Sequence, residues 1–304
     1  MTAWNAVAYL LALALALGGV LLVSRPAGGH GTVSSAAIVS VRDARGGELP
    51  VRAYARIAAL DLVSDELVGH LVEPARICAV SAWTQGPEAW RHAGLPRIEG
   101  LNDLEGLIRL RPDLVLVSTF GGEVDRIQRL RDAGIAVFDL GPAGGMRELT
   151  RNLRIVAQLI GAAERGERLA AQLERRMAAV AARVPPTSPR LRALVLTPVV
   201  DVVYGGTTGS SFHDIVVSAG LADAAEGRYR EPWPRIGAED ALAIDPDLVV
   251  TRGGAREALA RLPGFARLRA LRDGRVIELP VELFDSPGLS MLDAAELLHA
   301  KAYP

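Results

Sequence analysis

Few residues in this sequence have the type and spacing that metal binding or catalysis requires. Histidine occurs at five positions, and no two of them have the spacing of paired metal ligands on one helix: His30, His70, His92, His213 and His299. Ser210 and Ser211 follow a glycine, but the pattern is not Gly-x-Ser-x-Gly, and no order of acid and histidine supports a catalytic triad. The segment Gly205–Gly209 lacks the lysine of a phosphate-binding loop. We therefore expect no metal site, no bound cofactor and no enzymatic activity.

Aromatic side chains are scarce, at 5% of the residues, yet many of them follow predicted strands. One aromatic side chain can bury about 150–250 Å², which suits the recognition of a large flat ligand. The candidate ligand-contact residues are Trp83, Thr84, Phe120, Tyr204, Tyr229, Trp233, Arg252 and Phe284. The alternative is that some of these rings close hydrophobic cores.

Alternating strands and helices must position these loops. Before residue 145, continuous apolar runs separated by helical spacing occur at Arg56–Leu60, Arg76–Val80, Asp113–Val117 and Ile135–Leu140. After residue 184, further apolar runs occur at Leu191–Leu196, Asp247–Val250 and Val276–Leu279. Strands that are apolar throughout are typical of parallel sheets covered on both faces. We predict an α/β fold with lobes at residues 36–144 and 185–304.

A long amphipathic segment, Gly145–Val184, lies between the two predicted lobes. Its apolar residues recur at helical spacing, interrupted once by Gly161, and Pro185–Pro186 end it. We predict one connecting helix over residues 145–184. Because a single helix packed on both lobes should bend little, we expect only a small closure on ligand binding.

The two lobes contain copies of one sequence unit. Glu105–Val115 and Glu239–Val249 match in spacing throughout, and each contains Pro-Asp-Leu-Val. A glycine pair follows each copy, and then an arginine-bearing helix and a strand. Parallel sheets bind ligands at the carboxyl ends of their strands, so two such lobes predict a ligand cleft between them.

In this order of motifs the chain resembles the helix-linked periplasmic solute-binding proteins of ABC importers for cobalamin, haem and iron–siderophore complexes. The resemblance covers residue 37 to the C-terminus and rests on the two repeat units together with Val41–Gly46, Arg56–Leu60, Gly206–Ala224, Pro232–Pro234 and Arg272–Val276. It implies a monomeric carrier that delivers its ligand to a permease dimer in the inner membrane.

The resemblance also implies a docking glutamate on each lobe, here Glu105 and Glu239, that contacts arginines of the permease. For Glu105 there is an alternative, because Asn102-x-x-Glu105 is also a capping-box pattern. Either carboxylate could instead serve the dipole of its own helix. Their equivalent positions in the repeat favour docking.

The stretches Gly86–Trp90 and Glu231–Pro234 look most like cobalamin binders, whereas Ala82–Thr84 departs from them. We therefore expect cobalamin first, then haem or a ferric siderophore. His213 opens a predicted helix near the cleft, either as an axial ligand of haem iron or as a solvated residue of the first turn. Two other functions remain open. One is a chelatase-like tetrapyrrole enzyme that uses His213 or Glu231 as acid or base, and the other is an anchored ligand sensor.

Composition and the N-terminus suggest where the protein acts. A net charge of −1 with a single lysine, Lys301, argues against a nucleic-acid partner, and the single Cys78 excludes a disulfide within the chain. Residues 1–35 hold the apolar run Ala6–Val23 and a Pro, Gly and Ser-rich linker, so we expect an export segment or a membrane anchor. Cleavage near Ala27–Gly29 and retention as an anchor both remain open. Either predicts a periplasmic or extracytoplasmic protein.

Overall fold

The computed structural model describes residues 39–84, 92–119, 122–142, 144–183, 190–284 and 288–304. The chain divides into two units, residues 1–37 and residues 38–304, and the elements below belong to the second. The predicted export segment, Phe120 and the stretch Gly86–Trp90 lie outside the described residues. Among the residues that the structure describes, no helix has the length and apolar character needed to cross a membrane.

The N-terminal lobe contains a five-stranded parallel sheet in the order β5-β4-β3-β6-β7. The strands are β3 (Ile57–Ala59), β4 (Ile77–Ser81), β5 (Arg97–Ile98), β6 (Leu114–Val117) and β7 (Val137–Asp139). A small antiparallel hairpin of β1 (Ser40–Arg42) and β2 (Glu48–Pro50) precedes it. The strands β3, β6 and β7 are buried along their whole length, which confirms the prediction made from their apolar runs.

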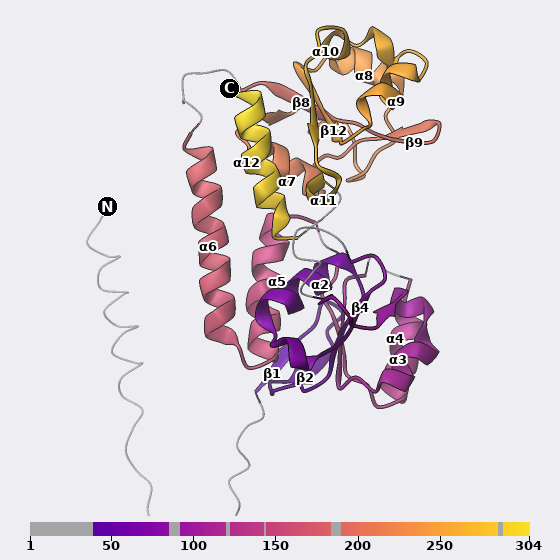
Figure 1. Ribbon diagram of the computed structural model, residues 1–304, viewed down its shortest axis with the longest axis vertical. Coiled ribbons are helices and arrows are strands. Elements are labelled where there is room, and N and C mark those ends of the chain that lie inside the picture. The colour runs from indigo at the N-terminus through magenta and orange to yellow at the C-terminus, as the bar shows by residue number, and fades with distance from the viewer. Residues whose placement is uncertain (1–38, 85–91, 120–121, 143, 184–189, 285–287) are drawn as a thin grey trace, which may run out of the picture. The chain divides into compact units, whose positions relative to one another are not determined.

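Helices cover both faces of this sheet (Figure 1). They are α2 (Leu62–Leu71), α3 (Leu104–Leu110) and α4 (Val124–Asp132). Ile57 and Leu114 pack in one apolar cluster with α2, whereas Ala58 and Val115 pack in another with α3 and α4. Because neighbouring strand residues point to opposite faces, α2 covers one face and α3 with α4 covers the other.

The C-terminal lobe repeats this plan with a four-stranded parallel sheet in the order β11-β8-β12-β13. Its strands are β8 (Arg192–Val195), β11 (Ala222–Asp223), β12 (Leu248–Arg252) and β13 (Val276–Leu279), and a hairpin of β9 (Thr197–Val199) and β10 (Val202–Tyr204) follows β8. Its helices are α7 (Ser211–Ser218), α8 (Ala238–Ile244), α9 (Arg256–Arg261), α10 (Arg269–Arg272), α11 (Val281–Phe284) and α12 (Ser290–Ala302). The predicted fold of two similar parallel-sheet lobes is confirmed.

The sequence repeat extends to individual hydrogen bonds. Asp113 accepts from the backbone N–H of Arg56 at 2.8 Å, and Asp247 accepts from the backbone N–H of Arg192 at 2.9 Å. The Arg56 side chain donates to the Leu110 carbonyl at the end of α3, and the Arg192 side chain donates to the Ile244 carbonyl at the end of α8. In each lobe the Pro-Asp-Leu-Val unit therefore ties a seven-residue helix to the start of two neighbouring strands.

The connection between the lobes differs from the predicted single helix. Helix α5 (Met146–Leu159) ends before Gly161, and α6 (Ala163–Ala181) begins after it. Gly161 has φ 75°, a left-handed conformation that ends a helix and that glycine adopts without strain. The long helix is α6, with 19 residues, and it lies beside α5 (Figure 1). Gly166 permits this approach, since a Cβ there would lie 2.2 Å from the Cβ of Ala157.

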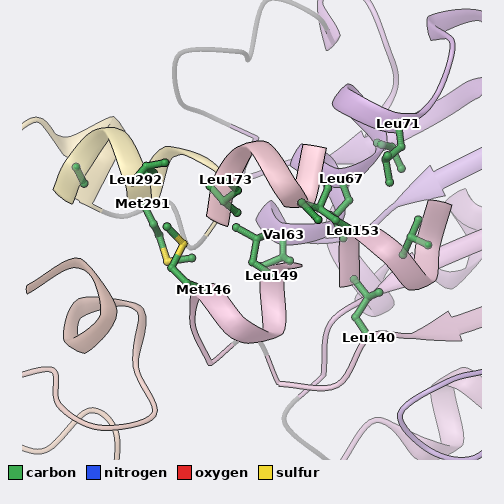
Figure 2. Packing of buried hydrophobic residues seen from close by; sticks show 14 of the residues in the cluster. Val63, Leu67, Leu71, Leu140, Met146, Leu149, Leu153, Leu173, Met291 and Leu292 are labelled. Carbon is green, nitrogen blue, oxygen red and sulfur yellow. The ribbon is translucent and has the colours of Figure 1, made fainter. Parts of the chain in front are cut away.

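One apolar cluster joins both lobes to this helical pair (Figure 2). It contains Leu149 of α5, Leu173 of α6, Leu67 of α2 and Leu292 of α12. Each of these side chains is at most 4% exposed. The core that holds α5 and α6 is therefore continuous with the cores of both lobes.

Two carboxylates, one from each lobe, reinforce this joint. Glu66 of α2 accepts hydrogen bonds from the backbone N–H of Leu289 and from the hydroxyl of Ser290, at the start of α12. Asp214 of α7 accepts from the backbone N–H of Met146 at the start of α5 at 2.6 Å. Neither α5 nor α12 has a side-chain cap from its own N-terminal residues. Asp214 of the C-terminal lobe therefore caps α5, and Glu66 of the N-terminal lobe caps α12.

Candidate functional site

A cavity of about 460 Å³ opens at the carboxyl end of the N-terminal sheet. The loops that follow β3, β4 and β6 line it with Leu60, Trp83 and Ser118. The short 3-10 helix Gly100–Asn102 forms another part of its wall. One residue of the C-terminal lobe, Trp233, completes the lining among the described residues. This is the edge at which parallel sheets bind ligands.

Two tryptophans face this cavity from the two lobes. Trp83 is 68% exposed and Trp233 is 36% exposed, which is unusual for side chains of this size. The structure therefore brings together two of the residues predicted to contact a ligand. Two exposed indoles on one cavity offer flat apolar surface to a large ligand.

The turn that carries Trp83 is held from below by helix α2. Ser81 ends β4, and its hydroxyl accepts from the backbone N–H of Trp83 at 3.0 Å. Asp65 of α2 accepts from the backbone N–H of Ser81 at 3.0 Å, and its other oxygen lies 2.7 Å from the hydroxyl oxygen of Thr84. Thr84, a predicted ligand contact, thus uses its hydroxyl within the turn and is absent from the cavity lining.

Asp61 holds a second cavity loop. As the N-cap of α2 it accepts from the backbone N–H groups of Val63 and Ser64, each at 3.0 Å. It also accepts from the backbone N–H of Ser118 at 2.7 Å, which fixes the loop after β6. Burial raises the pKa of this carboxyl. Helix α2 therefore organises the loops after both β4 and β6.

A charged network lies at the far side of the cavity. Arg45 donates to Thr119 Oγ1 at 2.7 Å and to Asp139 Oδ2 at 2.5 Å, and its guanidinium lies 3.6 Å from the carboxylate of Glu123. Thr119 and Glu123 line the cavity together with the exposed Arg126. The positive charge of Arg45 is thus already balanced within the protein.

The remaining predicted contacts in the C-terminal lobe lie outside this cavity. Tyr204 of β10 is half-buried with the guanidinium of Arg235 5.8 Å from its ring centre, and Tyr229 is half-buried against the lobe core. Burial raises the pKa of Tyr229. Arg252, the last residue of β12, is half-buried and has an interaction within the protein.

Phe284 belongs to the hydrophobic core, which is the alternative that the sequence left open for some of the aromatic residues. Its side chain is 2% exposed, and its ring packs against Phe212 with the ring centres 4.5 Å apart. A ligand cannot reach it without opening the contact between α11 and α7. We therefore leave it out of the candidate site.

His213 is held by a carboxylate. Its Nδ1 lies 2.9 Å from Asp223 Oδ2, which also accepts from the Thr207 hydroxyl at 2.7 Å. The side chain is 16% exposed and does not line the cavity of the tryptophans. Within the described ranges no three histidine, cysteine or acidic side chains are grouped as metal ligands.

Glu105 and Glu239 occupy the same place in the two lobes. Each is exposed and is the second residue of its helix, α3 or α8. The N-cap of α3 is Asp103, which accepts from the Gly106 N–H at 2.8 Å, so the capping-box alternative for Glu105 does not apply. Among the described residues neither glutamate side chain makes a hydrogen bond or an ion pair, which leaves both available to a partner.

Sequence reasoning missed the polar residues that shape the cavity: Arg45, Asp61, Asp65, Ser118 and Glu123. The signal for Asp61 was present, because Asp61-Leu-Val-Ser64 is a capping sequence at a helix start. The role of Asp65 had no such signal, since its partners lie 16 and 19 residues further along the chain.

Comparison with known proteins matches residues 57–283 to the family described as Periplasmic binding protein. An uncharacterized ABC transporter substrate-binding lipoprotein of Bacillus subtilis is 23% identical over 220 residues, which cover 68% of each chain. A vitamin B12-binding protein of Photorhabdus laumondii is 25% identical over 225 residues, 73% of this chain and 78% of the relative.

Among solved structures, the heme binding protein HmuT superimposes with a TM-score of 0.73 over 94% of this chain and 95% of that chain, at 22% identity. At this identity the likeness concerns the fold alone. It agrees with the two-lobed architecture described above.

Proposed function

We propose, from the premise that this chain belongs to the periplasmic binding protein family, that it captures a metal chelate for an ABC importer and delivers the chelate to the permease. This family consists of binding proteins, so the expectation of a non-enzymatic protein holds and the chelatase-like alternative falls away. The relative from Photorhabdus laumondii supports a chelate, because its name records vitamin B12 as a ligand, and the heme binding protein HmuT shares the fold.

The observation that carries the proposal is the pair of exposed indoles, Trp83 and Trp233, on one cavity at the carboxyl end of a parallel sheet. The cavity holds about 460 Å³, which lies within the usual range of small-molecule sites. Indoles from two lobes are suited to contact the two sides of a corrin or porphyrin plane.

Cobalamin fits the described lining better than haem does. A haem iron needs an axial ligand such as histidine, methionine, cysteine or tyrosine, and the described lining residues include none of these types. His213, the candidate for that role, is held by Asp223 away from the cavity. Cobalamin brings its own axial base, so it makes no such demand on the protein.

The charges of the lining point the same way. The described lining contains the carboxyl groups of Asp61, Glu99 and Glu123 and the guanidinium of Arg126. Asp61 is held by backbone N–H groups and Glu123 lies beside Arg45, so Glu99 is the exposed carboxylate of these three. The carboxylate of Glu99 disfavours the carboxylates of haem and can accept hydrogen bonds from the amides around a corrin ring, whereas Asn102 can both accept from and donate to these amides.

Delivery to the permease uses the exposed carboxylates of Glu105 and Glu239. Because they have equivalent positions on α3 and α8, each glutamate would dock its lobe on one half of a permease dimer. The protein would act as a monomer. We assign the protein to the periplasmic or extracytoplasmic side, and residues 1–35 to export or anchoring.

The ligand is tested by titrating the purified full chain with cyanocobalamin, haemin and ferric siderophores while recording tryptophan fluorescence and the visible spectrum of each ligand. We expect saturable quenching by cyanocobalamin at the lowest concentration. Tighter binding of haemin, with a spectral change that His213→Ala removes, would replace cobalamin by haem. No saturable binding of any of the three would refute the proposed function.

A further inference from the structure

We propose that Asp65 is a positioning residue whose proton locks the Trp83 turn of the cavity, so that the turn loosens when the carboxyl ionises. The Trp83 turn is defined here as residues 81–84. The locked turn requires only the contacts of Asp65. Its effect on binding rests on the proposed function, because it requires that Trp83 contacts the ligand.

Asp65 of helix α2 lies under the Trp83 turn, and this residue is 2% exposed. One oxygen accepts from the Ser81 N–H at 3.0 Å, and the other lies 2.7 Å from Thr84 Oγ1. Both ends of the Trp83 turn are thereby attached to one buried carboxyl group.

The hydroxyl of Thr84 makes two short contacts with oxygen atoms. Thr84 Oγ1 lies 2.7 Å from Asp65 Oδ2 and 2.6 Å from the carbonyl oxygen of Ser81. A threonine hydroxyl has one hydrogen, so it can donate to only one of these two oxygens. If Asp65 carries a proton, its O–H donates to Thr84 and Thr84 donates to the Ser81 carbonyl. Both short contacts are then hydrogen bonds.

If Asp65 is ionised, one of the two contacts brings two acceptors together. The hydroxyl then donates to the charged carboxylate, and the contact of 2.6 Å with the Ser81 carbonyl becomes repulsive. Relief requires the Thr84 end of the turn to move. The observed geometry therefore corresponds to the protonated carboxyl.

The electrostatic surroundings allow this proton near neutral pH. Burial is the main cause that raises the pKa of Asp65 to about 7, and the neighbouring Asp61 adds to the rise. Hydrogen bonds from Thr84 and Ser81 and the charge of Arg97 on β5 oppose it. Arg97 also donates to the carbonyl of Thr84 at 3.3 Å, so it faces the same turn.

The effect on binding follows from the population of the locked turn. With a pKa of about 7, the protonated fraction falls from about nine-tenths at pH 6 to about one-tenth at pH 8. If only the locked turn presents Trp83 to the ligand, the apparent Kd rises about tenfold over this range.

Three variants separate the proton from the packing. In Asp65→Asn the amide accepts from Ser81 and donates to Thr84 at every pH, which imitates the protonated carboxyl. Thr84→Val removes the hydroxyl while keeping the shape of the side chain. Asp125→Asn changes an exposed carboxylate in the first turn of α4 and serves as the matched control.

The test that needs no ligand is hydrogen exchange of the full chain at pH 6 and pH 8, followed in peptides that cover residues 77–84 and corrected for the intrinsic exchange rate. We expect protection of the turn to fall at pH 8 in the wild type and in Asp125→Asn. It should stay constant in Asp65→Asn, and it should be low at both pH values in Thr84→Val. Equal protection of the wild type at both pH values would overturn the inference.

The binding test titrates the same proteins with cyanocobalamin at pH 6 and pH 8. The wild type should bind about tenfold more weakly at pH 8, whereas Asp65→Asn should bind equally at both. A pH dependence that Asp65→Asn retains would also overturn the inference. If cyanocobalamin fails to bind at either pH while the exchange result holds, the choice of cobalamin as the ligand fails and the locked turn stands.

Discussion

The two exposed indoles are the residues on which ligand affinity should depend most. Trp83→Ala and Trp233→Ala should each weaken binding of the chelate at least about tenfold, because truncation of an aromatic anchor commonly costs about 2 kcal/mol or more and about 1.4 kcal/mol is already tenfold. Isothermal titration calorimetry measures this change. Val200→Ala is the control, since Val200 is 87% exposed and does not line the cavity. Equal affinities of the wild type and Trp83→Ala would remove Trp83 from the site.

Asp65 should also make the stability of the fold depend on pH. The pKa of its carboxyl is about 7 in the folded state and about 4 in the unfolded state. Between these values the folded state keeps a proton that the unfolded state has lost, so this group lowers the free energy of unfolding as the pH rises. The slope is at most about 1.4 kcal/mol per pH unit, and it vanishes above the folded pKa.

Urea unfolding from pH 4.5 to pH 8.5 measures this contribution as the difference between the wild type and Asp65→Asn. We expect the wild type to lose stability relative to the variant up to about pH 7 and the difference to stay constant above it. Parallel curves for the two proteins would show that Asp65 has an ordinary pKa.

The sequence predicted whether a residue lines the cavity only where its position in a loop was sufficient. Trp83 and Trp233 follow predicted strands or turns, and they do share a cavity. Thr84 and Phe284 have similar positions, but the hydroxyl of Thr84 is used by its own turn and the ring of Phe284 by Phe212. Those partners come from other elements, so periodicity and spacing could not identify them.

At the level of elements, we expect the equivalent helices α3 and α8 to contact the permease through Glu105 and Glu239. Glu105→Arg combined with Glu239→Arg should reduce ligand transport by more than about tenfold, because like charges then meet the arginines expected on the permease. Affinity for the ligand should be unchanged, since neither residue lines the cavity. Uptake assays and titrations of the same variant check both statements. A loss of ligand affinity would contradict the docking role.

The joint at the start of α12 makes a separate prediction about stability. Glu66→Ala removes the carboxylate that accepts from Leu289 and Ser290, and the loss of a helix cap costs about 0.5–2 kcal/mol. Urea unfolding should show a decrease of this size, whereas Glu282→Ala, an exposed glutamate on α11, should leave stability within about 0.5 kcal/mol of the wild type. No decrease for Glu66→Ala would mean that the cap adds nothing to the joint.

The elements themselves were largely predictable, because apolar runs and a repeat are local signals. The buried strands and the copies around Pro112 and Pro246 appear in the structure with matching hydrogen bonds. The break at Gly161 was the exception. An interruption of one residue leaves the apolar spacing on both sides intact, so the sequence pattern alone did not reveal that the chain reverses there.

For the whole molecule, the joint sets how far the lobes can move. The apolar cluster of Figure 2 includes residues of both lobes and of α5 and α6, and Glu66 and Asp214 cap helices across it. A large rotation would expose this cluster to water and break both caps. Small-angle scattering profiles with and without the chelate should therefore nearly superimpose, and a large domain rotation would contradict this expectation.

A metal chelate should bind between Trp83 and Trp233 at the carboxyl end of the N-terminal sheet. A crystal structure of the full chain with cyanocobalamin would locate the ligand. We expect the corrin ring in the cavity bounded by Leu60, Leu101 and Ser118, in contact with both indoles. A corrin bound elsewhere on the protein, or a complex in which neither indole touches the ligand, would contradict it.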